Sequence, residues 1–277
     1  MPRVIDLHCH MLPDIDDGAP DLEAALAMAR MAVADGIRLT ACTPHIYPGL
    51  YENDSARIRQ SVEGFRQSLD EAKIPLMVTV GADIHLVPEL VQRLKSGLYP
   101  TLHGSRYFLF EPPHHAVPAR FLESVFDGLS GGYVPVVTHP ERLTWLDKEH
   151  YGWFVEAARR GAWLQVTAGA LTGRFRDRAK YWAERMLDDG IVHLLATDAH
   201  SPDHRPPLLA EGREMAAKWV GGEEASRLVD ERPQAIIDDR DPADLAPPPA
   251  LGGRCLDKPE RVARRRWLPR IFSSANR

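Results

Sequence analysis

The sequence has few of the features that mark secreted, disulfide-stabilised or membrane-spanning proteins. Its 277 residues include 3 cysteines, which are too few and too scattered for a disulfide framework. No apolar run approaches the roughly 18 residues that a membrane-spanning helix requires. The first residues also lack the long apolar stretch of a secretion signal. We therefore expect a cytoplasmic protein.

The sequence also lacks an overall excess of positive charge. The formal net charge is -5 and the isoelectric point is about 6.2, so the chain as a whole has no electrostatic drive toward nucleic acid. Basic residues gather in the last segment, Arg254 to Arg277, around a few apolar side chains. We predict that this basic tail contacts an acidic partner or the inner membrane face, and the alternative is a disordered, solubilising end.

Short apolar runs of strand length alternate with helical patterning along most of the chain. Such alternation indicates a parallel sheet, and seven such units in one domain usually close into a barrel. We predict an α/β fold, a distorted seven-stranded barrel over residues 1–241, followed by a Pro-rich linker and the basic tail over 242–277. The expected strands are residues 4–7, 39–43, 76–82, 107–110, 134–138, 163–167 and 193–197. The expected helices are residues 22–34, 55–72, 88–95, 118–129, 151–160, 176–188 and 207–219.

Histidines and carboxylates stand at the ends of these strands. His8 and His10 are two residues apart at the end of the first strand, and strand alternation directs both to one face. Asp198 and His200 repeat this spacing after the last strand. Because the carboxyl ends of parallel barrel strands meet at one rim, we expect these groups to converge. The other members of the set are Asp17, His45, Asp83, Glu111 and His139.

Imidazole and carboxylate ligands in this mixture suit divalent cations such as manganese, iron, zinc or magnesium. The set contains no thiolate, which argues against a structural zinc site. We predict a centre that holds two or three divalent cations. Water activated by such cations is a natural nucleophile for phosphate ester hydrolysis.

Several motifs carry a resemblance to a known family. They are Asp6-Leu7-His8-Cys9-His10, Thr43-Pro44-His45, Gly81-Ala82-Asp83-Ile84, His139-Pro140-Glu141-Arg142 and Asp198-Ala199-His200 with Arg205-Pro206-Pro207. In these motifs the chain resembles the PHP (polymerase and histidinol phosphatase) superfamily, over about residues 4–237. Within the superfamily it is similar to the bacterial manganese-dependent protein tyrosine phosphatases of capsule and exopolysaccharide operons.

The resemblance implies a role for each ligand. His8, His10 and Asp198 would hold one cation, Glu111 and His139 a second, and Asp17, His45 and His200 a third. Position 83 would bridge the first two, although the family usually has Glu there and this chain has the shorter Asp83. Arg142 and Arg205 match arginines that hold phosphate, a task suited to the planar guanidinium group.

The implied function is hydrolysis of phosphotyrosine on a protein, with manganese as the cofactor and a bacterial tyrosine autokinase as the partner. A phenolate is already a good leaving group, so a general acid would matter little, and His45, His200 and Asp17 lie in the right region for one. A small-molecule phosphatase acting on histidinol phosphate, a PHP nuclease and a regulatory binding protein are the alternatives.

Two remaining patterns are interpreted as incidental. Cys255 and Arg261 match the spacing of cysteine-based tyrosine phosphatases, but acidic residues between them would repel phosphate. His114 and His115 follow two prolines and are expected in a solvated loop, with a position lining the rim as the alternative. The histidines at positions 85, 103, 150, 193 and 204 are expected at the surface or behind the ligands.

Overall fold

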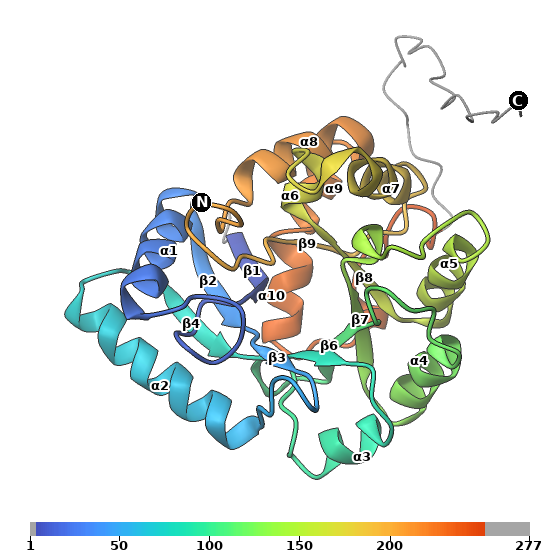
Figure 1. The fold of residues 1–277 in the computed structure, drawn as a ribbon. Helices are drawn as coiled ribbons and strands as arrows, with labels where there is room; N and C mark the ends of the chain where they lie inside the picture. The colour runs from blue at the N-terminus through green and yellow to red at the C-terminus, as the bar shows by residue number, and fades with distance from the viewer. Residues whose placement is uncertain (1–3, 253–277) are drawn as a thin grey trace, which may run out of the picture.

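The computed structural model describes residues 4–252, in which strands and helices alternate along the chain (Figure 1). The strands are β1 (Val4–Cys9), β2 (Ile37–Cys42), β3 (His45–Ile46), β4 (Met77–Val80), β5 (Asp83–His85), β6 (Tyr107–Glu111), β7 (Val134–Thr138), β8 (Trp163–Thr167) and β9 (Leu194–Ala196). The α-helices are α1 (Leu22–Ala34), α2 (Ser55–Glu71), α3 (Leu90–Lys95), α4 (Phe121–Ser130), α5 (Tyr151–Arg160), α6 (Ala168–Leu171), α7 (Arg176–Asp188), α8 (Ala210–Val220), α9 (Gly222–Arg227) and α10 (Glu231–Ile237).

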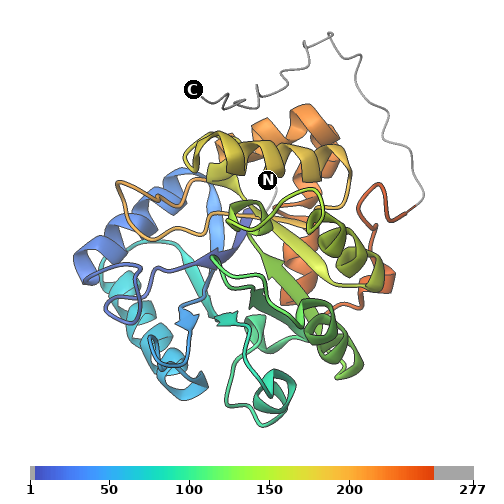
Figure 2. The same cartoon turned by 45° about the vertical axis from the view of Figure 1, so that its right-hand side comes forward.

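All paired strands are parallel and form two sheets, in the orders β1-β2-β4 and β3-β5-β6-β7-β8-β9. Backbone hydrogen bonds join the sheets beside β1 and β9, where Asp198 N donates to His8 O and His10 N donates to Ala199 O, each at 2.8 Å. On the other side the chain itself passes from one sheet to the other, from β2 to β3 and from β4 to β5. The carboxyl ends of the strands in both sheets thus face one side of the molecule, with the longer helices outside (Figures 1 and 2).

The α/β class and the parallel strands are confirmed, but a closed barrel of seven strands is not found in residues 4–252. The second and third predicted strands correspond to β2 and β4, and each is followed by a short strand that was not predicted, β3 or β5. Pro44, which has no N–H to donate, separates β2 from β3. Between β4 and β5, a Cβ atom on Gly81 would lie 2.8 Å from Thr43 Cγ2, so glycine lets the two strands pass closely here.

Local sequence signals explain where several helices begin and end. The carboxylate of Asp21 accepts a hydrogen bond from Ala24 N at the start of α1, and Asp54 does the same for Arg57 N at the start of α2. Gly161, with a φ of 110°, ends α5. Helices α6, α9 and α10 were not expected from the sequence because each has at most 7 residues and little periodicity.

The apolar core has two parts. The inner part lies within the ring of strands and includes Ile5, Leu109 and Trp163. Helix α10 contributes Ile236 to this inner part and lies across the middle of the ring in Figure 1. The larger part fills the space between the strands and the outer helices. The interior is thus packed, and a site can form only beyond the carboxyl ends of the strands.

Residues 242–252 pack against this domain. Leu245 is buried in the inner core, Arg232 Nε donates to Ala246 O, and Ala250 N donates to Gly190 O at 3.1 Å. The boundary predicted after residue 241 stays a prediction, and the predicted basic tail from residue 254 lies outside the described residues. Across residues 4–252, no helix has the length and apolarity to cross a membrane.

Candidate metal centre

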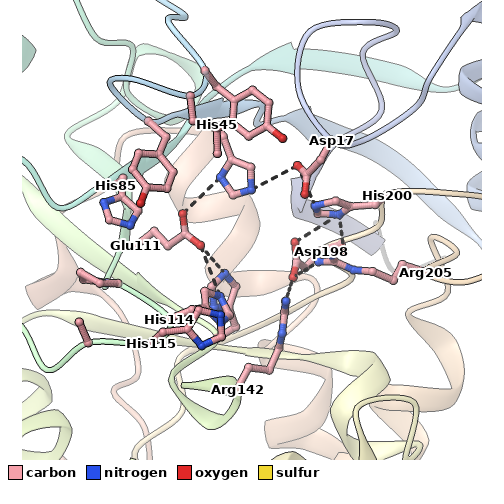
Figure 3. Close-up of a pocket in the computed structure, with 16 residues that line it drawn as sticks. Asp17, His45, His85, Glu111, His114, His115, Arg142, Asp198, His200 and Arg205 are labelled. Carbon is pink, nitrogen blue, oxygen red and sulfur yellow. Dashed lines mark hydrogen bonds and ion pairs between the residues drawn. The ribbon is translucent and has the colours of Figure 1, made fainter. Parts of the chain in front are cut away.

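The structure brings the predicted metal ligands together at the carboxyl ends of the strands, where six of them line a cavity of about 450 Å³ (Figure 3). The other three, His8, His10 and Asp83, are fully buried. His8 belongs to β1, His45 to β3, Asp83 to β5 and Glu111 to β6. His139 directly follows β7. His8, Glu111 and His139 lie at the carboxyl ends of their strands, and His45 and Asp83 begin the short strands that follow β2 and β4. One rim therefore collects side chains from distant parts of the sequence.

The most buried part of the cluster is formed by β1 and the segment after β9. The Nε2 atoms of His8 and His10 lie 3.1 Å apart. Asp198 Oδ1 lies 3.3 Å from His8 Nε2 and 3.4 Å from His10 Nε2. On the other side of His8, Asp83 Oδ2 lies 3.3 Å from the same nitrogen. These side chains face one another with donor atoms that can share a cation.

A second group lies nearer the cavity opening. Asp17 Oδ1 is 3.5 Å from both His45 Nε2 and His200 Nε2. The rings of His10 and His200 are 3.9 Å apart between centroids. His45 Nδ1 faces Glu111 Oε2 at 3.2 Å, so the histidine stands between this group and the next.

A third group contains Glu111 and His139, with Glu111 Oε1 3.7 Å from His139 Nε2. Asp83 Oδ2 is also 3.7 Å from His139 Nε2. Asp83 therefore lies between the group around His8 and the pair Glu111 and His139. This is the position that the resemblance gives to a bridging ligand.

Unpartnered buried atoms show that the cluster suits cations. Asp83 Oδ2, His45 Nδ1 and His200 Nε2 are buried and make no hydrogen bond, and they face other members of the cluster at 3.2–3.5 Å. A buried polar atom that lacks a partner costs roughly 1–3 kcal/mol, and a charged one costs more. A bound divalent cation would satisfy such atoms, and the nitrogen and oxygen donors fit a borderline to hard ion.

The electrostatics of the carboxylates agree with this reading. Burial opposes ionisation of Asp83, but His8, His139 and His45 hold the pKa of its carboxyl well below the usual range. The pKa of Glu111 is also lowered by His114 and His45, against the effects of burial and of Asp83. Both groups are therefore carboxylates at neutral pH, as metal ligation requires.

Two residues behind the ligands orient histidine rings. The carboxylate of Asp16 accepts from His10 Nδ1 at 2.7 Å and from the backbone N–H of His45 at 2.9 Å. Gln165 Oε1 lies 2.9 Å from His8 Nδ1. With a proton on each Nδ1 atom, the Nε2 atoms of His8 and His10 are left free to bind cations.

The two predicted phosphate-binding arginines border the same cavity. Arg142 Nη1 and Arg205 Nη2 both donate to Asp198 Oδ2, the latter at 2.5 Å. The ring of Phe175 lies under both guanidinium groups, at 4.5 Å from Arg142 and 5.7 Å from Arg205. Burial lowers the pKa of each arginine to about 10, so both remain positive at neutral pH.

The opening of the cavity is aromatic on one side. Tyr47 stacks on His85 with 4.0 Å between ring centroids, and Tyr51 stacks on His45 at 5.8 Å. Leu50, at 62% exposure, extends this wall toward solvent. The cavity can therefore receive an aromatic group whose anionic end reaches the arginines.

Sequence reasoning missed several residues of this site. Asp16 was given no role, and Gln165 lies inside a buried strand that gave no sign of a site. His114 was expected in a solvated loop, yet its Nε2 lies 3.5 Å from Glu111 Oε1. The aromatic side chains at positions 47, 51 and 175 lie outside any strand-end pattern.

The fold and the cluster together define a candidate multi-metal enzyme with a positively charged recess beside its ligands. The family model for capsular polysaccharide synthesis, CpsB/CapC, matches residues 4–238. The chain belongs to this family.

Individual relatives support the assignment. The chain is 35% identical over 221 residues to tyrosine-protein phosphatase YwqE of Bacillus subtilis, covering 79% of this chain and 86% of that protein. It is 28% identical over 246 residues to tyrosine-protein phosphatase CpsB of Streptococcus pneumoniae, covering 86% of this chain and 99% of that protein.

Solved structures agree. A chain from the crystal structures of YwqE and CpsB, described as unique metal-dependent tyrosine phosphatases, matches with a TM-score of 0.80 and 30% identity. The match covers 94% of this chain and 100% of that chain. A lactonase from Listeria monocytogenes has a TM-score of 0.54 and 12% identity, which shows a shared fold alone.

Proposed function

We propose that this protein is a metal-dependent protein tyrosine phosphatase that hydrolyses phosphotyrosine with a metal-activated water. One observation carries the proposal. Asp198 presents Oδ1 to His8 and His10 and Oδ2 to Arg142 and Arg205. A single carboxylate therefore links the cation ligands to the guanidinium groups, so a phosphate held by the arginines would lie beside the cations.

We assign the ligands to cations from their proximity. His8, His10 and Asp198 would hold one ion, Glu111 and His139 a second, and Asp17, His45 and His200 a third, with Asp83 between the first two. The first set is itself a group of donor atoms that lie within 4.8 Å of one another, and the second and third sets belong to such groups together with His114 and His10, respectively. We propose manganese as the ion, with iron, zinc and magnesium as the other metals that suit these donors.

When bound, divalent cations lower the pKa of water toward neutrality and offset negative charge on a transferring phosphoryl group. The arginines of this chain bind and orient the phosphate, because paired guanidinium groups offer several N–H donors in a fixed plane. The Tyr47–His85 stack would flank the aromatic ring of the substrate. Since a phenolate leaves readily, a proton from His45 or His200 would add little to the rate.

The physiological substrate would be a phosphotyrosine protein, for which we propose a bacterial tyrosine autokinase. The exposed edge formed by Tyr47 and Leu50 supports a protein substrate, because a peptide segment beside the phosphotyrosine needs an open, partly apolar border. The proposed cytoplasmic location and the tail contact with an acidic partner or membrane stay predictions from the sequence.

A direct comparison of substrates tests the proposal. With added Mn²⁺, the purified protein should release phosphate from a phosphotyrosine peptide faster than from histidinol phosphate. The His139→Ala variant should lose this activity, while His204→Ala, a change at an exposed histidine outside the cluster, should keep it. Faster hydrolysis of histidinol phosphate would favour the small-molecule phosphatase, and no phosphate release at all would favour a regulatory binding protein.

A further inference from the structure

The loop after β6 places a histidine beside the ligand pair formed by Glu111 and His139. We infer that His114 is a third side-chain ligand of the cation held by this pair, an inference that rests on the proposed metal-dependent function. His114 comes after two prolines, away from any strand end, so the strand-end pattern does not predict it.

The donor atoms are spaced as a shared cation requires. His114 Nε2 lies 3.5 Å from Glu111 Oε1, and that oxygen lies 3.7 Å from His139 Nε2. Metal–ligand bonds of about 2.1 Å place neighbouring donors roughly 3.0 Å apart in an octahedral site and roughly 3.4 Å apart in a tetrahedral one, so a shared cation requires only a small approach of these atoms. The rings of His114 and His139 are 4.9 Å apart between centroids, and both present Nε2 to the same Glu111 oxygen.

Asp83 does not form a close donor group with both Glu111 and His139. Its Oδ2 lies 3.3 Å from His8, and it is grouped with His8 and His139 or with His45 and Glu111. Among the described residues, the close donor group that contains both Glu111 and His139 has His114 as its third member. Without His114, the second cation would be held by Glu111 and His139 alone, apart from the carboxylate of Asp83 that it shares with the first cation.

The backbone of the loop is fixed in place on the side away from the cluster. Thr144 donates to His114 O twice, from its N–H at 3.0 Å and from its hydroxyl at 2.9 Å. Trp145 Nε1 donates to Pro113 O at 2.7 Å. A ligand needs such support, because a side chain on an unrestrained loop loses more entropy when it binds.

The next residue offers a matched control. His115 lies in the same loop and borders the same cavity, but its Nδ1 faces the Thr144 hydroxyl at 3.5 Å. It belongs to none of the close donor groups found among the described residues. A change at His115 therefore alters the loop without removing a proposed ligand.

Metal binding tests the inference directly. We would dialyse the wild type, His114→Gln and His115→Gln proteins against a series of free Mn²⁺ concentrations and measure the bound manganese per chain. His114→Gln should weaken binding of one ion by at least about tenfold, the lower end of the effect of losing even an indirect partner of a ligand. His115→Gln should match the wild type. Equal binding curves for wild type and His114→Gln would overturn the inference.

A second measurement uses the unaltered protein, so it does not depend on folding of the variant. Diethyl pyrocarbonate modifies accessible, unprotonated imidazole nitrogen, and the His114 side chain is 27% exposed. Mn²⁺ should protect His114 from modification and leave His115 equally reactive, as measured by mass spectrometry of peptides. If Mn²⁺ protected neither residue, His114 would not be a ligand.

The two proposals fail in different ways. A wild-type protein that binds no manganese, or binds it without hydrolysing phosphotyrosine, would contradict the proposed function. A wild-type protein that does both, beside a His114→Gln variant with unchanged metal binding, would contradict only the role of His114.

Discussion

Replacement of Asp16 by Asn should weaken metal binding although Asp16 is not itself a proposed ligand. Its side chain is fully buried, and three N–H groups reach its carboxylate. Oδ2 accepts from His10 Nδ1 and from His45 N, and Oδ1 accepts from Gly18 N at 3.0 Å. Asn at this position has one oxygen and one NH₂ group, so it cannot accept all three bonds.

The magnitude follows from these contacts. With its oxygen toward His10 and His45, Asn turns its NH₂ group against Gly18 N, and a neutral amide replaces the carboxylate that raises the basicity of His10. With its oxygen toward Gly18, it turns the NH₂ group against two donors, and each lost bond to a charged group is worth about 1.5–3 kcal/mol. In this second orientation the simplest relief is a change of tautomer in His10, which then accepts at Nδ1 and carries its proton on Nε2. That proton blocks the nitrogen facing Asp198, so we expect a loss of about 10- to 100-fold in metal affinity, the range for such supporting contacts.

The assay is activity on a phosphotyrosine peptide as a function of Mn²⁺ concentration. Asp16→Asn should need about 10- to 100-fold more Mn²⁺ for half-maximal activity. Asp14→Asn is the matched control: Asp14 is exposed two residues away, and its φ of 52° is one that Asn tolerates. An Asp16→Asn curve that coincides with the wild type would refute the role assigned to this carboxylate.

Three further predictions concern the arginines and a buried acid. Arg142→Lys should lower kcat/KM on the peptide by about tenfold or more, because lysine cannot reproduce the planar donors of guanidinium. An unchanged kcat/KM would exclude a contact between Arg142 and the phosphate. Phe175→Leu should raise KM by about two- to fivefold with a smaller effect on kcat, since the ring beneath Arg142 and Arg205 contributes about 0.5–1 kcal/mol. Equal KM values would count against this positioning role. Burial raises the pKa of the Glu141 carboxyl to about 7, so ionisation of this group destabilises the folded state as pH rises to that value. Glu141→Gln, which stays neutral, should therefore raise the free energy of unfolding by up to about 3 kcal/mol at pH 8 but not near pH 4. Denaturant unfolding at both pH values checks this, and a pH-independent difference would contradict it.

Much of the ligand set was predictable because strand alternation and the shared rim of parallel strands are strict geometric rules. Two histidines at positions 8 and 10 must share a face, and every strand end must reach the same side. Those rules do not distinguish Asp16 from Asp17, which are neighbours in a loop. The structure turns Asp16 toward His10 and Asp17 toward His45 and His200.

The remaining features depend on tertiary contacts that leave no periodic signal. In the sequence, Gln165 is a single polar residue in a buried strand. Its contact with His8 is evident only in the structure, where β8 places the two side chains together. In the sequence, His114 is an ordinary loop residue. Its place beside the cluster depends on hydrogen bonds from Thr144 and Trp145 that hold the loop. The end of β4 at Val80 and the separate strand β5 likewise depend on a tertiary contact, the close approach of Gly81 to Thr43.

The measurement that tests the central claim most directly is anomalous scattering at the manganese edge from crystals of this protein grown with Mn²⁺. We predict two or three peaks in the cavity, one beside His8 and His10, one between Glu111 and His139, and a third, where present, beside His45 and His200. Peaks found only at other places on the protein, or none at all, would contradict a metal centre built from these residues.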